Sequence, residues 1–548
     1  MRPTTDVGEV FDGFDYVVVL MLENRSFDNL LGYLYPDGVP DNAPAGKTFE
    51  GVAGKNLANP IPNTATGQSA PPRGVTSIPV SPVPDPPDYH QPFPDPGEQY
   101  YHVNTQLFNV INGNDKEPYN LPSPVPTTPG MQGFVSDYIA SFPLGDTDGG
   151  AGPKYQQYQP IMQCFKPEQV PVLTTLAEQF AVFDHWFCSV PSHTCCNRAF
   201  WHAGTSWGHV INFGDPDYYD ENTASWVADS IGETLFNKIS DSGLSSPLDW
   251  RVYSSNEASL TGIIHAGALA AYHTPLDDHF PRLEDFFTDC AAGTLPKYSF
   301  LEPVFWTPHN DQHPSTWDDK NYGPDVVGSV LLGEELIWSV YNAIKNSTGA
   351  HGGKGNSWRN TLLIITHDEH GGCYDHVAPP TGVTPPDLSG YTKWDDFDFT
   401  RLGVRVPMVM VSAHIAPNTV INTCHDHTSF LKTMFKKWSR YITGPLTARD
   451  AAAPDFREVF TAPALRDVST WPDIPKPQIP AGLWDIDFST VPLTDLQRSI
   501  VAGAAAVAGV PLPQQPKTQG EAIAFLRGLH ALKRLPGQNP RPNSNPCE

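Results

Sequence analysis

Acidic and imidazole side chains gather in one short stretch of the chain, His367-Asp368-Glu369-His370. The preceding residues, 361–366, are apolar and rich in β-branched side chains, which predicts a strand that is buried on both faces. Gly371 and Gly372 follow and allow the backbone to turn. Two adjacent carboxylates at the end of a buried strand are costly unless they are paired or bind a metal ion. The structural alternative is a solvated acidic loop.

The histidine spacing in this stretch excludes a zinc protease of the zincin type. Zincins bind their metal through two histidines that lie four residues apart on a helix. His367 and His370 are three residues apart and follow an expected strand.

A second polar cluster has the same arrangement. Residues 14–22 predict another buried strand, and Glu23-Asn24 follow it directly. If both strands are parallel and central, Glu23-Asn24 and Asp368-Glu369 meet at the edge of the sheet where ligands bind in open α/β folds. Carboxylate and amide oxygens suit a hard divalent cation. The structural alternative is that Glu23-Asn24 cap a helix that begins near Ser26.

A hydroxyl group that could act as a nucleophile belongs to Thr194, which lies in a polar turn just before Asn197 and Arg198. A nucleophile, a guanidinium that binds anions and amide donors are the groups that phosphoryl transfer requires. The structural alternative is a threonine that starts a helix. His313 and His427 lie in further polar clusters, so five such clusters are expected at one edge of the sheet.

The elements that must position these residues follow the pattern of a parallel sheet. Strands are predicted at 250–254 and 297–301, and a helix at 324–347 leads into the strand over 361–366. Strand, helix, strand is the repeating unit of an α/β fold. Residues 405–412 predict one more strand, and its proline favours a position at or near the edge. Further helices are predicted at 171–180, 430–438, 494–508 and 520–535.

The chain divides into a large catalytic domain over 1–450 and a small C-terminal appendage over 451–548, which contains a linker and short helices. Residues 36–160 form a proline-rich insert within the first part. Loops of this length are usually functional lids or disordered segments. The insert is rich in aromatic residues, which disordered segments normally lack, so we expect it to fold over the active face.

Composition excludes several function classes. The formal net charge of −26 over 548 residues disfavours nucleic acid as a partner and electrostatic docking to anionic membranes. No apolar run is long enough for a transmembrane helix, and residues 1–15 do not resemble a signal peptide. We therefore expect either an intracellular protein or an exported one whose leader was removed. The eight cysteines include no Cys-x-x-Cys pair, which argues against a structural zinc site and leaves one or two disulfides possible.

Five motifs together resemble the phosphoesterase family, which contains bacterial phospholipases C, plant non-specific phospholipases C and acid phosphatases. The resemblance covers residues 14–440 in the order that the family shows. It implies the fold of the alkaline phosphatase superfamily, a three-layer α/β/α arrangement around a mostly parallel central sheet. The motifs are Leu22–Asn29, Thr194–Arg198, Asn310–Pro314, His367–His376 and Asp426–Ser429.

The same resemblance implies residue roles. Thr194 corresponds to the family's nucleophile, which also binds a divalent metal ion; calcium, magnesium, manganese and zinc all remain possible. The other implied metal ligands are Glu23, Asn24, Asp368 and Glu369. Histidines would hold phosphate oxygens or protonate the leaving group, and the candidates are His102, His313, His202 and His427. The family's proline before Asn-Arg is Cys196 here, which affects the expected conformation of that loop.

The implied reaction is hydrolysis of a phosphoric ester through a covalent phosphothreonine. A phospholipase C would cleave a phospholipid diester during transient contact with a membrane surface, and an acid phosphatase would take small monoesters. A non-catalytic binding protein on this fold would be expected to have lost the nucleophile or a metal carboxylate, and all of these are present. A sulfatase needs a Cys/Ser-x-Pro-x-Arg motif, which Thr194–Arg198 does not match.

Overall fold

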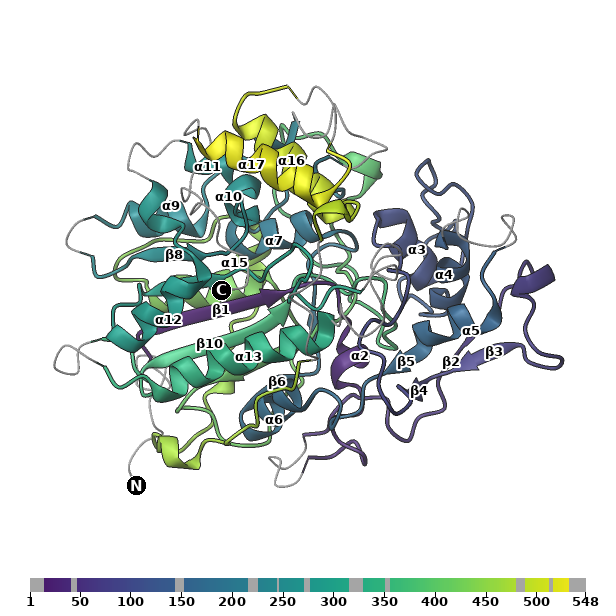
Figure 1. Ribbon diagram of the computed structural model, residues 1–548, viewed down its shortest axis with the longest axis horizontal. Coiled ribbons are helices and arrows are strands. Elements are labelled where there is room, and N and C mark those ends of the chain that lie inside the picture. Colours follow the sequence, from purple (N-terminus) through teal and green to yellow (C-terminus); the bar gives the residue numbers. More distant parts are fainter. Residues whose placement is uncertain are drawn as a thin grey trace.

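The computed structural model describes residues 14–40, 47–142, 152–214, 225–243, 246–270, 276–314, 329–349, 355–479, 488–511 and 516–531. A seven-stranded sheet in the order β12-β6-β11-β10-β1-β9-β8 forms the centre of this part of the chain (Figure 1). All its strands are parallel except β11. The strands are β1 (Tyr16–Leu22), β6 (Ala181–Phe183), β8 (Trp250–Tyr253), β9 (Tyr298–Leu301), β10 (Thr361–His367), β11 (Met408–Val411) and β12 (Thr419–Ile421).

The two central strands predicted from the sequence are confirmed. Every residue of β1 and β10 is buried, as expected for apolar runs that are covered on both faces. The two strands pair in parallel, from Tyr16 opposite Thr361 to Leu22 opposite His367. Their carboxyl ends therefore lie side by side at one edge of the sheet.

The prediction that the strand near Pro407 lies at or near the edge of the sheet is wrong. Strand β11 lies between β10 and β6 and is antiparallel to both. Pro407 precedes Met408, the first residue of the strand, so its ring removes no donor from the ladder. The Pro407 carbonyl instead accepts a hydrogen bond from the Thr366 hydroxyl at 2.9 Å.

Helices pack against the sheet and against one another. In Figure 1, α13 (Ser329–Asn346) runs across the front of β10, beside α6 (Pro171–Gln179). The Glu334 carboxylate of α13 accepts the Val172 and Leu173 amides of α6, at 2.6 and 3.0 Å. Trp201 of α7 (Thr194–Ala203) stacks on Phe430 of α14 (Thr428–Lys437), and both pack near Tyr298 of β9. Other elements are α2 (Phe27–Leu31), β7 (Trp186–Phe187), α9 (Leu235–Ser240), α10 (Leu260–Ile264), α11 (Ala266–Leu269), α12 (Leu283–Ala292), β13 (His425–Asp426) and α15 (Ala448–Ala452).

The described part of the proline-rich insert has a small core of its own. Figure 1 places it to the side of the sheet, next to α2. Several contacts tie it to the edge of the sheet where β1 and β10 end. The Arg25 guanidinium donates to the Gln91 carbonyl at 2.6 Å, and Gln106 Oε1 lies 2.7 Å from His370 Nε2. The insert contains β2 (Ala58–Pro60), β3 (Ser77–Pro79), β4 (Ser81–Pro82), α3 (Tyr100–Phe108), α4 (Phe134–Ser141) and α5 (Tyr155–Tyr158), and β4 pairs with β5 (Gln163–Cys164) just beyond it.

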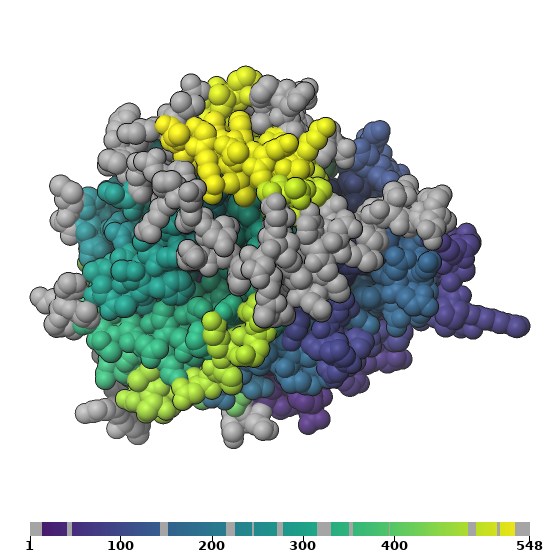
Figure 2. Space-filling model, viewed as in Figure 1, coloured from purple at the N-terminus to yellow at the C-terminus, as the bar shows by residue number. Residues whose placement is uncertain are grey.

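The C-terminal helices α16 (Asp495–Val507) and α17 (Gln519–Ala531) lie at the top of the face that Figure 2 shows. Leu496 and Ile500 of α16 share an apolar core with Trp207 and Phe305. The domain boundary at residue 450 stays a prediction. In the described part of the chain, no helix combines the length and hydropathy needed to cross a bilayer. None of the seven cysteines that the structure describes forms a disulfide.

A buried ion network joins the segments that follow β1 and β10. Arg405 Nη2 donates to Asp28 Oδ1 at 2.8 Å, and its Nε donates to Asp375 Oδ1 at 2.9 Å. His376 Nδ1 lies 2.6 Å from Asp28 Oδ2. Arg405, Asp28 and Asp375 are completely inaccessible to solvent. The network thus joins α2, which follows β1, to the turn that follows β10.

We expect Arg405→Met to lower the free energy of unfolding by about 3–5 kcal/mol, because it leaves buried carboxylates without their cation. The matched control is Lys436→Met, which removes an ion pair to Asp455 from a side chain that is 41% exposed. That control should cost at most about 1 kcal/mol. Urea titration followed by circular dichroism measures both values. Equal losses in the two variants would contradict a structural role for the buried network.

Candidate active site

The pairing of β1 with β10 places the two predicted acidic clusters side by side. The ladder continues past the strands, since the Asp368 amide donates to the Leu22 carbonyl at 3.2 Å. The Glu23 amide donates to the Asp311 carbonyl at 2.8 Å, which brings the segment containing His313 to the same edge. The structure therefore brings together three of the five clusters through backbone contacts alone.

Arg198 of α7 lies between the carboxylates of these clusters. Its Nε donates to Asp368 Oδ2 at 3.1 Å, its Nη2 donates to Glu23 Oε1, and Nη2 also reaches the Met21 carbonyl at 3.2 Å. Burial lowers the pKa of Arg198, but Glu23 and Asp368 raise it by more, so the pKa lies above its ordinary value. This guanidinium, expected from the sequence to bind an anion, is paired with two acids of the protein.

Thr194 begins helix α7 and points to the same acids. Its Oγ1 donates to Glu23 Oε2 at 3.0 Å. Asn197 shapes the turn before it: Oδ1 accepts the Val190 amide at 2.9 Å, and Nδ2 donates to the Ser192 carbonyl at 2.8 Å. Asn197 is thus engaged with the backbone of the turn that presents the Thr194 hydroxyl.

Among the described residues, two buried oxygen atoms at this edge have no hydrogen-bond partner, Asn24 Oδ1 and Glu369 Oε1. Burial, reinforced by Asp368, raises the pKa of both Glu23 and Glu369 well above the ordinary value for a glutamate. Unsatisfied oxygens and crowded carboxylates are the features that a divalent cation relieves. The predicted ligands therefore fit a hard cation by their donor chemistry.

Within the described residues, two sets of three possible ligands have donor atoms within 4.8 Å of one another. The first consists of Asp28, Asp375 and His376, where Arg405 already supplies the positive charge. The second consists of Asp95, Glu98 and His313. Glu23, Asp368 and Glu369 form no such set, and Arg198 bridges two of them. The predicted ligands suit a cation because two of their oxygen atoms are unsatisfied, although their donor atoms are not gathered around one point.

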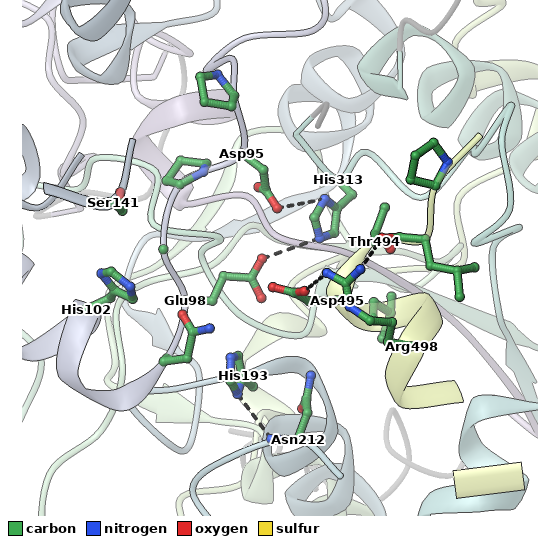
Figure 3. Close-up of a pocket in the computed structure, with 17 residues that line it drawn as sticks. Asp95, Glu98, His102, Ser141, His193, Asn212, His313, Thr494, Asp495 and Arg498 are labelled. Atoms are coloured by element: carbon green, nitrogen blue, oxygen red, sulfur yellow. Dashed lines mark hydrogen bonds and ion pairs between the residues drawn. The ribbon is translucent and has the colours of Figure 1, made fainter. Parts of the chain in front are cut away.

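A pocket of about 350 Å³ has Asp95, Glu98 and His313 in its wall (Figure 3). Thr194 and the predicted cation ligands are not among the residues that line it. Its walls come from the insert, from the His193 and Asn212 region next to Thr194, from His313, and from residues 492–498 at the start of α16. The backbone N–H of Asn212 donates to His193 Nδ1 at 3.1 Å, which holds the His193 ring in the pocket wall. The pocket can hold a ligand next to the N-terminus of α7.

The four predicted histidines have different surroundings. His102 and His313 line the pocket, and His102 Nδ1 lies 2.7 Å from Asp137 Oδ1, which orients the ring. Asp95 and Glu98 raise the pKa of His313 well above its ordinary value, although burial opposes this shift. Two candidates, His202 and His427, do not line the pocket.

His427 and His202 make contacts away from the pocket. His427 Nε2 lies 2.6 Å from the Asp368 carbonyl, and its Nδ1 accepts the Trp186 indole N–H at 3.2 Å, so the ring supports the backbone behind Asp368. His202 Nε2 lies 2.8 Å from the Tyr298 hydroxyl. Burial and the neighbouring His265 lower the pKa of His202 well below its ordinary value.

Sequence analysis missed Asp95 and Glu98, which lie beside His313 in Figure 3. It also missed residues 492–498 as part of the pocket wall. A local signal existed only for the first pair, because Asp95 and Glu98 flank a Pro-Gly turn just before the aromatic residues of α3. The contribution of α16 depends on packing between distant segments, which local patterns do not reveal.

Sequence comparison with known proteins shows the family to which the chain belongs. The model of the phosphoesterase family matches residues 14–439. Non-specific phospholipase C6 of Arabidopsis thaliana is 32% identical over 477 residues, which cover 84% of this chain and 75% of that protein. Non-specific phospholipase C3 of the same plant is 29% identical over 90% of this chain and 82% of its own length. Phospholipase C B of Mycobacterium tuberculosis is 25% identical over 85% of this chain and 81% of its own length. The chain therefore belongs to the phosphoesterase family and is a phosphoric ester hydrolase.

Proposed function

We propose that this enzyme cleaves phosphodiesters in the manner of a phospholipase C, with Thr194 as the nucleophile. The observation that carries the proposal is the 3.0 Å hydrogen bond from Thr194 Oγ1 to Glu23 Oε2, at the N-terminus of α7 and beside the pocket. One divalent cation would be held by Glu23, Asn24, Thr194, Asp368 and Glu369. When bound, it would lower the pKa of the Thr194 hydroxyl and offset the negative charge of the phosphate.

In the first step, Thr194 Oγ1 attacks phosphorus and a phosphothreonine forms. The threonine proton moves along the existing hydrogen bond to Glu23, and the bond from phosphorus to the leaving alcohol oxygen breaks. His102 or His313 donates the proton that this alcohol needs. Asp137 holds His102 by Nδ1, so that Nε2 is the atom available for exchange. The positive end of the α7 dipole favours the phosphate throughout.

In the second step, water attacks phosphorus from the side that the alcohol has left. The histidine that gave up its proton takes one from this water, and the bond between Thr194 and phosphorus breaks. Glu23 returns the threonine proton to Thr194 Oγ1 along the same hydrogen bond, which restores the starting state. Arg198 stays paired with Glu23 and Asp368 through both steps. Its role is to neutralise buried charge, so that two carboxylates can lie next to a phosphate group.

The preference for a phospholipid diester rests on the relatives, which are named phospholipases C. A pocket of about 350 Å³ is large enough for a phosphorylated head group, and a lipid tail would extend beyond it. An acid phosphatase acting on small monoesters is the alternative. A substrate panel separates them: phosphatidylcholine and p-nitrophenylphosphorylcholine report on diester cleavage, and p-nitrophenyl phosphate reports on monoester cleavage. A marked preference for the monoester would overturn the assignment to the phospholipase C type.

We expect Thr194→Ala to lower kcat by several orders of magnitude, as is usual when a nucleophile is removed. Thr194→Ser should keep substantial activity, because serine presents the same oxygen. Acid-quenched turnover followed by peptide mass spectrometry should find phosphate on the peptide that contains Thr194. The matched control is Thr174→Ala, since this buried threonine of α6 bonds only to backbone carbonyls. Direct attack by water would show itself as wild-type turnover in Thr194→Ala without a phosphorylated peptide.

We expect removal of the cation by EDTA to abolish activity and to lower Tm. Addition of one equivalent of the divalent cation should restore both. A ligand at 100 times its Kd stabilises the folded state by about 2.7 kcal/mol, which calorimetry detects readily. Glu369→Gln should weaken cation binding, whereas Glu178→Gln on α6 should not. Full activity in protein shown to be free of metal would refute the proposed cation.

A further inference from the structure

The orientation of one amide group decides whether Asn24 can serve as a cation ligand. Asn24 is completely buried, and its backbone has a φ of 55°, in the left-handed region. The backbone N–H of Asn24 donates to Asp368 Oδ1 at 3.3 Å. Gly371 packs so closely that an added Cβ would lie 2.3 Å from the Asn24 carbonyl oxygen. The backbone is thus fixed from both sides, and the remaining choice is which end of the side-chain amide faces which neighbour.

Glu98 of the insert makes that choice. Its Oε1 lies 2.5 Å from Asn24 Nδ2. A carboxylate can only accept a hydrogen bond, so this contact is favourable when the NH₂ end of the amide faces Glu98. A flipped amide would bring its carbonyl oxygen against the carboxylate, which is repulsive. In the observed orientation, Asn24 Oδ1 is buried and has no hydrogen-bond partner among the described residues. The same is true of Glu369 Oε1.

His313 makes a second contact with the same NH₂ group. Its Nε2 lies 2.9 Å from Asn24 Nδ2, and its Nδ1 lies 2.9 Å from the Pro314 carbonyl. In the neutral ring, Nδ1 donates to Pro314 and Nε2 accepts from Asn24. The role of a histidine nitrogen depends on its tautomer, whereas the Glu98 carboxylate can only accept, so Glu98 is the contact that determines the orientation.

We propose that Glu98 is a positioning residue, which holds the NH₂ end of Asn24 so that Oδ1 serves as a cation ligand. The inference rests on the cation of the proposed function. A residue that hydrogen-bonds to a metal ligand commonly contributes about 10–100-fold to metal affinity. Glu98 comes from the insert, so the insert takes part in cation binding through a residue outside the predicted ligand set.

A different role for Glu98 gives different results. One donor atom each of Asp95, Glu98 and His313 lies within 4.8 Å of the other two, so these residues could hold an ion directly. In that case Asp95 would matter as much as Glu98, and Asn24 would not transmit the effect. If Glu98 acts by orienting Asn24, its removal matters only while the Asn24 side chain is present.

The test is a double-mutant cycle on the full chain, with the affinity for Mn²⁺ measured by titration calorimetry after EDTA dialysis. Glu98→Gln should weaken Mn²⁺ binding about 10–100-fold. In the Asn24→Ala background, the same change should alter affinity by less than about twofold, because its effect passes through Asn24. The matched control is Asp95→Asn, which removes the same charge three residues away and should also stay within about twofold of wild type.

Glu98→Asp separates position from charge, since it keeps the carboxylate but shortens the side chain. It should weaken Mn²⁺ binding as Glu98→Gln does, and full affinity in this variant would overturn the proposal. Equal losses in both backgrounds, or a loss in Asp95→Asn as large as in Glu98→Gln, would assign Glu98 as a ligand instead. Circular dichroism of the metal-free variants confirms folding. A wild-type chain without cation affinity would refute the proposed function itself, whereas unchanged binding in Glu98→Gln would refute only this inference.

Discussion

The in-register parallel pairing of β1 with β10 is the constraint on which the site depends. Because Leu22 lies opposite His367, Glu23 and Asp368 leave the sheet at the same edge. Their carboxylates are buried there, and burial of like charges demands compensation. Arg198 supplies one positive charge from α7. The position of α7 then also places the hydroxyl of its first residue against one of the acids.

Two buried arginines show how charge balance separates structure from function. Arg405 is bonded to Asp28 and Asp375, and His376 joins the network, so positive groups match the acids. Arg198 faces Glu23 and Asp368, while the nearby Glu369 keeps an oxygen without a partner. The first network is complete and holds segments together. The network around Arg198 has fewer positive groups than carboxylates, and this deficit favours the binding of a cation.

Local patterns predicted the features that local sequence controls. Apolar runs predicted the central strands, and the acidic residues after them lie together at one edge of the sheet, as expected. The position of β11 between β10 and β6 could not be predicted from Pro407. This proline disfavours an interior strand only if it lies within the ladder, and the local sequence does not show that the ladder begins at Met408. The surroundings of His202 depend on Tyr298 of a distant strand. Glu98 was missed for the same reason, since its partner Asn24 lies 74 residues earlier in the chain.

The pocket combines residues 94–102 of the insert with residues 492–498, which lead into α16 and form its first turn. Folding generally begins at the N-terminal side during synthesis, which proceeds at about 5–20 residues per second. The sheet and its acidic edge can form before α16 has been synthesised, but the pocket cannot. A nascent chain can thus have its acidic edge in place while one wall of the pocket is still missing. The pocket is therefore completed late in the synthesis of the molecule.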